Sequence, residues 1–440
     1  MKKLNYCLLA LIFMVASCAK DQLFNPPETL PGNSSPYNLI FPQIRIAVVS
    51  DIHYMDPSIA PDDPENNQDW QTYVSHDRKI FELSDPIFRN VVADLINEKP
   101  DIQLIQGDLA KEGELVCQET VKSFLQQLEN AGIKVFVVPG NNDIGNTDAM
   151  TYKTDPPSSV PSISADDFAT IYSDFGYSEA IYRDPASLSY ICQPYKGLWI
   201  LGIDGVKRSA SGVSGAINTL TLAWIQDKMV EANAKKIKVL AMMHYGILEH
   251  YTGQKNLEPL IKSSQANAIA LMNAGIRLIF TGHYHANDIV DFTNEGKTLT
   301  DIQTGSLVTP PFSYRMMTLD DNFINIDSRR VTDVESESTG GMDFLTYCNI
   351  KITSRINSFF MYYKAYVESI YQIPDEQYSI AVPFFTNAYL AYFAGDEKIS
   401  REESRNLDVL AQSVPSALPL LNSLWTDLAP ADNKIHIKLK

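Results

Sequence analysis

Short segments typical of buried strands alternate with helical segments in the first third of the chain, and this alternation constrains the fold most. The strand-like runs are rich in β-branched residues, whereas the helical runs repeat their apolar residues every three or four positions. In chain order the segments are 43–50, 81–98, 102–105, 121–130 and 133–138. Because a helix lies between successive strands, neighbouring strands run parallel, and the sequence predicts an α/β architecture.

The same pattern continues to about residue 327 and then changes. Further strands are expected at 198–203, 237–243, 276–281, 302–307, 315–319 and 323–327, with a helix at 220–233. Beyond residue 334 aromatic residues are dense, with fourteen from Phe344 to Phe393, and strand-like alternation is rare. We therefore expect a first domain over 43–333 and a mostly helical C-terminal domain over 334–440, in which the aromatic residues serve mainly for packing.

The N-terminus has the pattern of an export signal. Two lysines precede a ten-residue apolar run, 7–16, which is too short to span a membrane. The small residues before Cys18 resemble the lipobox of bacterial lipoproteins, and this resemblance implies removal of residues 1–17 and lipidation of Cys18. An ordinary cleaved signal beside a chance cysteine is the alternative.

The residues that follow the signal indicate a tether and a location. Residues 18–42 are rich in turn formers and are interpreted as a flexible tether. Ala19, directly after the lipidated position, resembles the signal for sorting to the outer membrane. We therefore expect a protein of the bacterial cell envelope, in contact with the membrane only through its lipid anchor.

Polar residues gather where five of the predicted strands end. They are Asp51 and His53, Asp108, Asn141, His244, and His283 and His285. In α/β sheets the carboxyl ends of the strands are where binding sites form. Asp51 and His53 are two residues apart, so on an extended chain they face the same way, about 6.5 Å apart. Four of only seven histidines are used in this set, so the sequence predicts one common site.

The residue types in this set are those of a metal centre. Imidazole nitrogen combined with carboxylate and amide oxygen, without thiolate, suits Mn, Fe or Zn. Seven ligands exceed what one tetrahedral zinc ion takes. They suit two divalent metal ions that share a carboxylate, about 3.5–4 Å apart.

The order D-x-H, G-D, G-N-x-D, H and G-H-x-H resembles the calcineurin-like metallophosphoesterase superfamily, over about Ile44 to Asp327. The resemblance implies a four-layer αββα sandwich with two mixed sheets. It implies that one ion is held by Asp51, His53, Asp108 and His285, and that Asp108 bridges to a second ion held also by Asn141, His244 and His283. It further implies hydrolysis of a phosphomonoester or phosphodiester by attack of a hydroxide that bridges the ions.

One position departs from the family pattern. The family usually has a histidine after the motif asparagine, whereas this chain has Asn142, whose amide cannot act as a general acid near neutral pH. Asp143 follows and is expected to orient its neighbours. Another proton donor, water or a good leaving group must then complete the reaction. His76 and His250 are candidate donors, although a surface or packing role is the ordinary reading for each.

Two further residues are candidates for contact with the substrate. Tyr284 lies between the two histidines of the last motif, and Arg315 follows a strand end and carries a guanidinium that suits phosphate.

The function classes that remain are a phosphoesterase and a metal-binding lipoprotein without catalysis. The enzyme would act on a small-molecule, lipid or nucleotide phosphate ester, and the alternative would use the C-terminal domain for interaction. The net charge of −17 and the lack of a basic cluster argue against a nucleic-acid partner. The sequence leaves the substrate and the oligomeric state open.

Overall fold

The computed structural model describes residues 43–439 apart from 210–211 and 259. The predicted signal peptide 1–17, the lipidation site Cys18 and the tether 18–42 lie outside the described residues. Within the described part of the chain, no helix is both long and apolar enough to cross a membrane.

The first sheet contains the strand that begins the described chain. Its strand order is β17-β16-β15-β1-β2-β3. The strands are β1 (Ile44–Val49), β2 (Ile102–Ile105), β3 (Lys134–Val137), β15 (Ser313–Leu319), β16 (Phe323–Arg330) and β17 (Lys434–Lys438). β1, β2 and β3 are parallel, and β15 joins β1 in the antiparallel sense, with Val48 opposite Arg315.

The second sheet has the order β13-β14-β12-β11-β8-β7-β6. Its strands are β6 (Tyr182–Arg183), β7 (Tyr190–Tyr195), β8 (Leu198–Ile203), β11 (Lys238–Met243), β12 (Leu278–Thr281), β13 (Ile289–Asn294) and β14 (Lys297–Gln303). β8, β11, β12 and β14 are parallel, whereas β7 and β13 are antiparallel to their neighbours.

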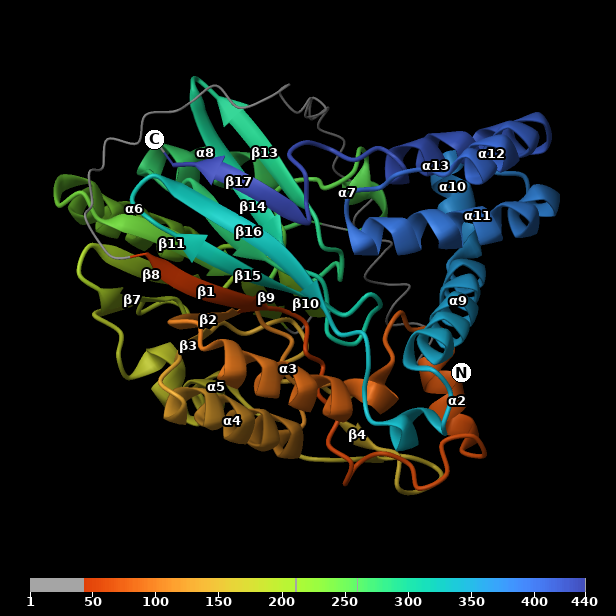
Figure 1. Cartoon of the computed structure of the whole chain (residues 1–440), viewed down its shortest axis with the longest axis horizontal. Coiled ribbons are helices and arrows are strands. Elements are labelled where there is room, and N and C mark those ends of the chain that lie inside the picture. The colour runs from red at the N-terminus through yellow and green to blue at the C-terminus, as the bar shows by residue number, and fades with distance from the viewer. Residues whose placement is uncertain (1–42, 210–211, 259, 440) are drawn as a thin grey trace.

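Two helices cover the outer face of each sheet, so the molecule has four layers (Figure 1). The helices are α3 (Ser84–Glu98) and α4 (Leu115–Asn130) on the first sheet, and α6 (Thr219–Ala234) and α8 (Ser264–Ala274) on the second. Along β8, Leu198 and Ile200 join the core shared with the first sheet, whereas Trp199 and Leu201 join the core under α6 and α8. This two-residue period buries both faces, and the predicted αββα sandwich of two mixed sheets is confirmed.

Shorter elements connect the layers. They are α2 (Gln68–Val74), η1 (Phe81–Leu83), β4 (Met150–Thr151), β5 (Ser158–Ser159), α5 (Ala165–Ile171), η2 (Ser173–Tyr177), β9 (Val206–Ser209), β10 (Gly212–Gly215), α7 (Gln254–Leu257), η3 (Ser336–Thr339) and η4 (Pro415–Ala417).

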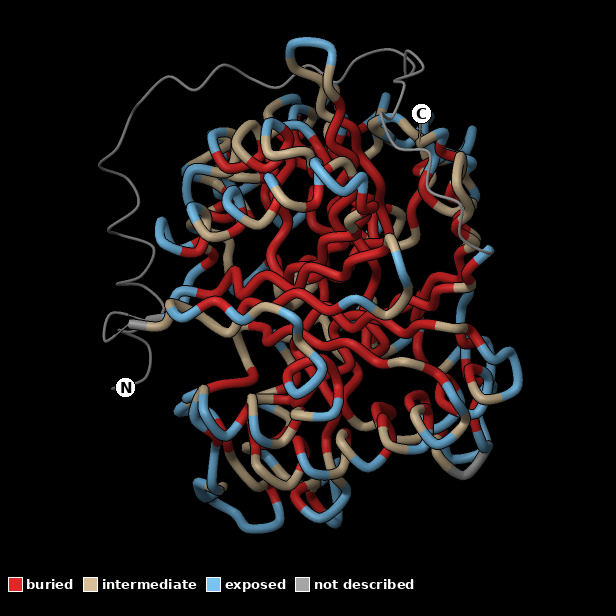
Figure 2. Tube along the Cα trace, turned by 90° about the vertical axis from the view of Figure 1, so that its left-hand side faces the viewer, coloured by how far each residue is buried: buried red, intermediate tan, exposed pale blue. Residues whose placement is uncertain are grey.

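The C-terminal region is helical, as expected, but it ends in a strand that the sequence did not predict. Its helices are α9 (Phe344–Tyr362), α10 (Lys364–Tyr371), α11 (Asp375–Ala394), α12 (Arg401–Ser413) and α13 (Leu418–Leu424). The chain then returns to the first sheet, where β17 pairs with β16. Apolar residues of α9 and α11 belong to the same buried cluster as those of β1. Figure 2 shows this buried interior along the central strands.

Several expected strands agree closely with the structure, but one does not. The runs 102–105 and 198–203 coincide with β2 and β8. The run expected at 302–307 continues past the end of β14 at Gln303, because its last residues turn toward the first sheet. There the Ser306 hydroxyl donates a hydrogen bond of 2.8 Å to the carbonyl oxygen of Asp51.

Candidate metal centre

Glycines allow the loops at the strand ends to approach each other closely. Gly107 has φ +88°, and a Cβ there would lie 2.5 Å from the backbone nitrogen of Gly140. A Cβ on Gly282 would lie 1.9 Å from Oγ of Ser50. Only glycine fits at these positions without displacing backbone or buried atoms, so the loops after β1, β2, β3 and β12 meet at one edge.

The backbone of the candidate ligands is left-handed rather than extended. Positive φ angles occur at Asp51 (50°), His53 (43°), Asp108 (51°), His283 (76°) and His285 (65°). The assumption that Asp51 and His53 lie on an extended chain is therefore wrong, because the chain turns sharply after β1. Residues other than glycine rarely adopt this conformation, and such residues concentrate at functional sites. Backbone hydrogen bonds from Asp51 to Gly107 (3.1 Å) and from His53 to Asp108 (2.9 Å) hold the turn.

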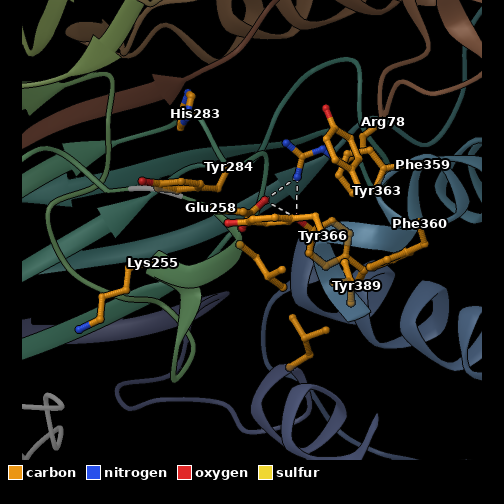
Figure 3. Close-up of a pocket in the computed structure, with 13 residues that line it drawn as sticks. Arg78, Lys255, Glu258, His283, Tyr284, Phe359, Phe360, Tyr363, Tyr366 and Tyr389 are labelled. Carbon is orange, nitrogen blue, oxygen red and sulfur yellow. Dashed lines mark hydrogen bonds and ion pairs between the residues drawn. The ribbon is translucent and has the colours of Figure 1, made fainter. Parts of the chain in front are cut away.

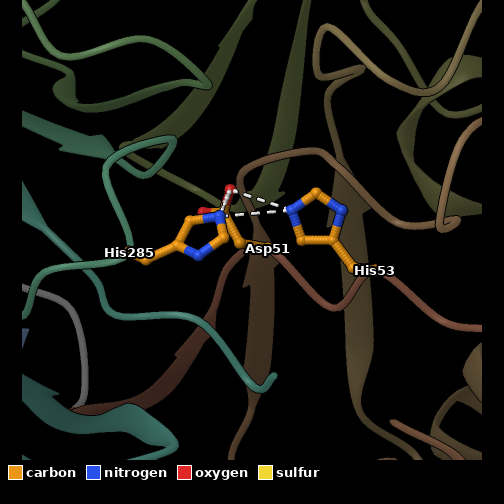
Figure 4. Close-up of side chains that lie close together, drawn as sticks. All are labelled: Asp51, His53 and His285. Atoms are coloured by element: carbon orange, nitrogen blue, oxygen red, sulfur yellow. Dashed lines mark hydrogen bonds and ion pairs between the residues drawn. The ribbon is translucent and has the colours of Figure 1, made fainter. Parts of the chain in front are cut away.

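The first group of candidate ligands consists of Asp51, His53 and His285 (Figure 4). The Nε2 atoms of His53 and His285 lie 3.2 Å apart. Oδ1 of Asp51 lies 3.5 Å from Nε2 of His285 and 3.8 Å from Nε2 of His53. This buried oxygen accepts no hydrogen bond from the described residues. Its lone pairs and the two imidazole nitrogens converge on one small space.

The second group consists of Asp108, His244 and His283. Nε2 of His244 lies 3.4 Å from Oδ2 of Asp108, 3.3 Å from Nδ1 of His283 and 3.0 Å from Oδ1 of Asn141. Oδ2 of Asp108 also lies 3.5 Å from Nε2 of His53. Asp108 therefore connects the two groups, and all seven predicted ligands are brought together.

The electrostatics of the two groups suit a cation. Burial lowers the pKa of His53, His283 and His285 well below the usual value, so these imidazoles are neutral. Burial raises the pKa of Asp51 to about 6. Burial opposes ionisation of Asp108, but the adjacent His244 lowers the pKa of its carboxyl below the usual range. Neutral imidazoles and a buried carboxylate oxygen without a donor fit divalent metal ions.

Asn142 and Asp143 both act on the loops around Asp108. The backbone and side-chain amides of Asn142 donate to the two carboxylate oxygens of Asp108, each at 2.8 Å. The carboxylate of Asp143 accepts from the backbone nitrogens of Leu109 (2.8 Å) and Gly140 (2.7 Å). Asp143 thus ties the loop after β2 to the loop after β3.

Arg315 requires a correction, because the structure places it elsewhere than at the candidate metal ligands. Its guanidinium is fully buried and donates to the carbonyl oxygens of Gln303 and Asp432, each at 2.5 Å. Its side chain therefore joins β15 to the neighbouring backbone. Both terminal nitrogens of the guanidinium are engaged there and are not directed at a phosphate.

The two candidate proton donors are also separate from the ligands. His250 is buried, with Nδ1 2.8 Å from Oδ1 of Asp288 and Nε2 3.5 Å from Oδ2 of Asp301. His76 is exposed, and its ring lies 4.8 Å from the ring of Tyr362. His250 is therefore engaged by buried carboxylates, and His76 by an aromatic contact with α9.

A cavity of about 260 Å³ adjoins the second group at His283. Tyr284, which is buried, lies between His283 and Glu258 in this cavity (Figure 3). The far wall of the cavity is aromatic and comes from the C-terminal helical region. Its residues include Phe359, Phe360, Tyr363, Tyr366 and Tyr389. Arg78 lies in the cavity with its guanidinium 2.5 Å from Glu258. The sequence did not predict this cavity, since its walls come from segments far apart in the chain.

Lys79 also acts on the candidate ligands, and the sequence did not predict it. After burial, the charge of Lys79 is the largest influence that lowers the pKa of His53. Its ammonium lies 3.3 Å from Asp77 and 5.0 Å from the ring centre of Phe81. The preceding loop carries no recognisable motif, so only the fold brings this cation to the ligands.

The fold and the convergent ligands define a phosphoesterase architecture with a metal-binding edge. The sequence model of the calcineurin-like phosphoesterase family matches residues 44–287, and the chain belongs to that family.

Other comparisons give weaker similarity. Among solved structures, a dimetal phosphatase from Danio rerio is 12% identical with TM-score 0.44, over 65% of this chain and 96% of that one. A purple acid phosphatase from yellow lupin seeds is 13% identical with TM-score 0.40, over 72% of this chain and 54% of that one. None of the curated proteins compared with the chain matches it.

Proposed function

We propose that the protein hydrolyses phosphomonoesters or phosphodiesters at a centre of two divalent metal ions, Mn, Fe or Zn. The observation that carries this proposal is the pair of ligand groups joined through Asp108, with Oδ2 of Asp108 3.5 Å from His53 and 3.4 Å from His244. When bound, two such ions polarise a phosphoryl group and lower the pKa of a water molecule, as in other two-metal hydrolases.

The chain's own residues prepare the ligands for this role. The Thr309 hydroxyl donates its proton to the carbonyl oxygen of Arg78 (2.9 Å), so its oxygen accepts from Nδ1 of His285 (2.7 Å). Nδ1 of His244 similarly donates to the carbonyl oxygen of Gln106 (2.7 Å). Both contacts turn Nε2 toward the centre, and in the neutral ring this nitrogen carries a lone pair. Asp51, His53 and His285 would hold one ion, and Asn141, His244 and His283 the other, with Asp108 shared.

The leaving group would lie in the aromatic cavity beside His283. Tyr284 and the rings of α9 and α11 offer faces to an apolar or aromatic alcohol. Asn142 cannot protonate a poor leaving group, and this cavity favours aryl esters, whose leaving groups need no acid. Substrates of this class are the ones that we expect the enzyme to cleave fastest.

The test is hydrolysis of a chromogenic aryl phosphate and its diester by the purified protein. We expect turnover that a chelator abolishes and that Asp108→Asn lowers by at least about 10³-fold, since the shared ligand is removed. The isosteric amide keeps the shape of the side chain; circular dichroism of this variant detects misfolding, and elemental analysis then detects loss of metal from the folded protein.

The alternative is a metal-binding protein without catalysis, and Asn142 is the observation that favours it. Full metal occupancy without turnover on a broad panel of aryl and alkyl phosphate esters would support it and would contradict the enzyme.

We also propose that Cys18 anchors the protein by lipid to the cell envelope, in the outer membrane. The basis is the sequence pattern before that residue. Radiolabelled palmitate should be incorporated into the wild-type chain and not into Cys18→Ala, and the variant should leave the membrane fraction. Equal labelling of both chains would contradict the anchor.

A further inference from the structure

A second cluster of carboxylates lies outside the candidate metal centre. Asp288, Glu397 and Asp432 each place one oxygen within 4.8 Å of the others. They come from the loop before β13, from the connection between α11 and α12, and from the segment before β17. Their exposed fractions are 1%, 7% and 0%, so all three are removed from water.

No other described residue gives the carboxylate of Glu397 a hydrogen bond to compensate for its burial. Neither of its carboxylate oxygens accepts a hydrogen bond from another described residue. By contrast, the oxygens of Asp432 accept from the backbone nitrogens of Ile289 (2.7 Å) and Asp396 (2.6 Å). A buried carboxylate without a donor is costly unless a cation or a proton neutralises it, and one oxygen of Glu397 lies within 4.8 Å of an oxygen of each of the two other acids.

Among the buried side chains of the described residues, acids outnumber bases around the cluster. The buried carboxylates of this region are Asp288, Asp301, Glu397 and Asp432. The facing basic groups are His250, whose Nδ1 lies 2.8 Å from Asp288, and Arg315, whose guanidinium binds carbonyl oxygens. Four acids therefore face two basic groups, and when all of them are ionised the excess of two negative charges is that of one divalent cation. At the rim, Asp396 and Asp427 add further acid, and the charge of Lys398 acts on Asp427.

The three segments are fixed against one another by contacts that do not involve the carboxylates. The backbone nitrogen of Asn287 donates to the carbonyl oxygen of Phe393 at 3.2 Å. A Cβ on Gly395 would lie 2.2 Å from the carbonyl oxygen of Asn287. The side chain of Asn287 donates to that of Asn433 at 3.0 Å. The carboxylates are thus held together by the fold and not by chance rotamers on a surface.

We propose that Asp288, Glu397 and Asp432 form a calcium site. Oxygen is the only ligand atom that the three residues offer, and Ca²⁺ takes carboxylate oxygens at 2.3–2.6 Å in flexible geometry. Ligand atoms up to about 5 Å apart can share such an ion, and those of the cluster lie within 4.8 Å of one another. The ion fastens the C-terminal segment to the loop that follows His283 and His285.

The competing arrangement is a proton shared among the carboxyls. Burial raises the pKa of Glu397 to about 10, so the calcium-free cluster retains a proton at neutral pH. Glu397→Gln distinguishes the two, because an amide mimics the protonated acid in shape but binds calcium poorly.

The experiment measures thermal unfolding of the full chain, first loaded with Mn²⁺, with and without millimolar Ca²⁺. At about a hundredfold excess over Kd we expect Ca²⁺ to raise the Tm of the wild type by about 3 °C. The rise should persist in Asp108→Asn, which alters the other metal centre, and in Glu402→Gln, an exposed control on α12. It should disappear in Glu397→Gln. Calcium content after gel filtration should be one equivalent in the first three proteins.

The calcium site is contradicted if Ca²⁺ leaves the Tm of the wild type unchanged, and Glu397→Gln should then be equally or more stable. That result assigns a proton to the cluster. If Asp108→Asn abolishes the rise in Tm, calcium binds at the candidate metal centre around Asp108. That result also contradicts the calcium site. If Glu397→Gln does not fold, Asp288→Asn takes its place and should abolish the rise in Tm. The wild type should still hold one equivalent of calcium, and failure of either result contradicts the site.

Discussion

At the scale of single residues, a hydroxyl decides which nitrogen of His285 faces the candidate ligands. Thr309 donates to the carbonyl oxygen of Arg78 and can therefore only accept from Nδ1 of His285. The remaining nitrogen, Nε2, then carries a lone pair toward Asp51 and His53. The pattern G-H-x-H predicts the ligand but not its tautomer, because Thr309 is supplied by a distant loop.

Removing this hydroxyl should weaken metal binding. Thr309→Val keeps the shape of the side chain but gives Nδ1 of His285 no acceptor, and we expect metal affinity to fall by about 10–100-fold. Thr309→Ser restores the acceptor and should bind metal like the wild type. Titration of the apo-protein with Mn²⁺ measures both, and equal affinity of all three proteins would exclude an orienting role.

Substitutions of Asn142 test whether the missing imidazole limits the choice of leaving group. In Asn142→His, a group that can donate a proton enters the position that the family usually occupies with histidine. We expect the ratio of alkyl to aryl ester cleavage to rise by up to about 10²-fold. Asn142→Ala removes the side-chain hydrogen bond to Asp108 without adding an acid, so its ratio should remain that of the wild type although its rates fall. A wild type that already cleaves alkyl esters as fast as aryl esters would show that another acid exists.

At the scale of elements, the loops at the strand ends require glycine where two loops meet. Gly107 and Gly296 both have positive φ, but a Cβ on Gly296 meets nothing within 4 Å. Alanine substitutions at the two positions therefore separate the cost of the left-handed backbone from the cost of the clash between the loops.

Gly107→Ala should destabilise the protein more than Gly296→Ala does. The left-handed backbone costs about 1–2 kcal/mol at either position. The clash with Gly140 should add about 2 kcal/mol at Gly107 only, as in other overpacked cores. Denaturant unfolding measures the difference, and equal losses would mean that the loops relax without cost.

The aromatic wall of the cavity gives a prediction on specificity. Phe359 lies on α9 and lines the cavity, whereas Phe384 on α11 does not. Phe359→Ala should raise KM for a naphthyl phosphate by about tenfold, the scale of one lost aromatic contact, and leave KM for methyl phosphate unchanged. Phe384→Ala is the matched control. A parallel rise for both substrates would mean that the helix supports the fold and does not contact the leaving group.

Across the molecule, the sequence predicted the ligands that follow strand ends and missed the contacts whose partners carry no motif of their own. The ligands follow buried strands in short motifs, so the α/β pattern and D-x-H were enough to place Asp51 and His53 at one site. The role of Arg315 depends on the carbonyl oxygens of Gln303 and Asp432, and β17 depends on pairing with β16. No periodicity within either segment carries that information.

Titration of metal-free protein with Mn²⁺ or Zn²⁺, followed by aryl phosphate hydrolysis at each step, tests whether the two ligand groups form a catalytic metal centre. Two ligand groups joined through Asp108 predict that activity rises to a plateau at two equivalents of metal per chain. Protein that binds two equivalents yet hydrolyses neither the monoester nor the diester would contradict the phosphoesterase.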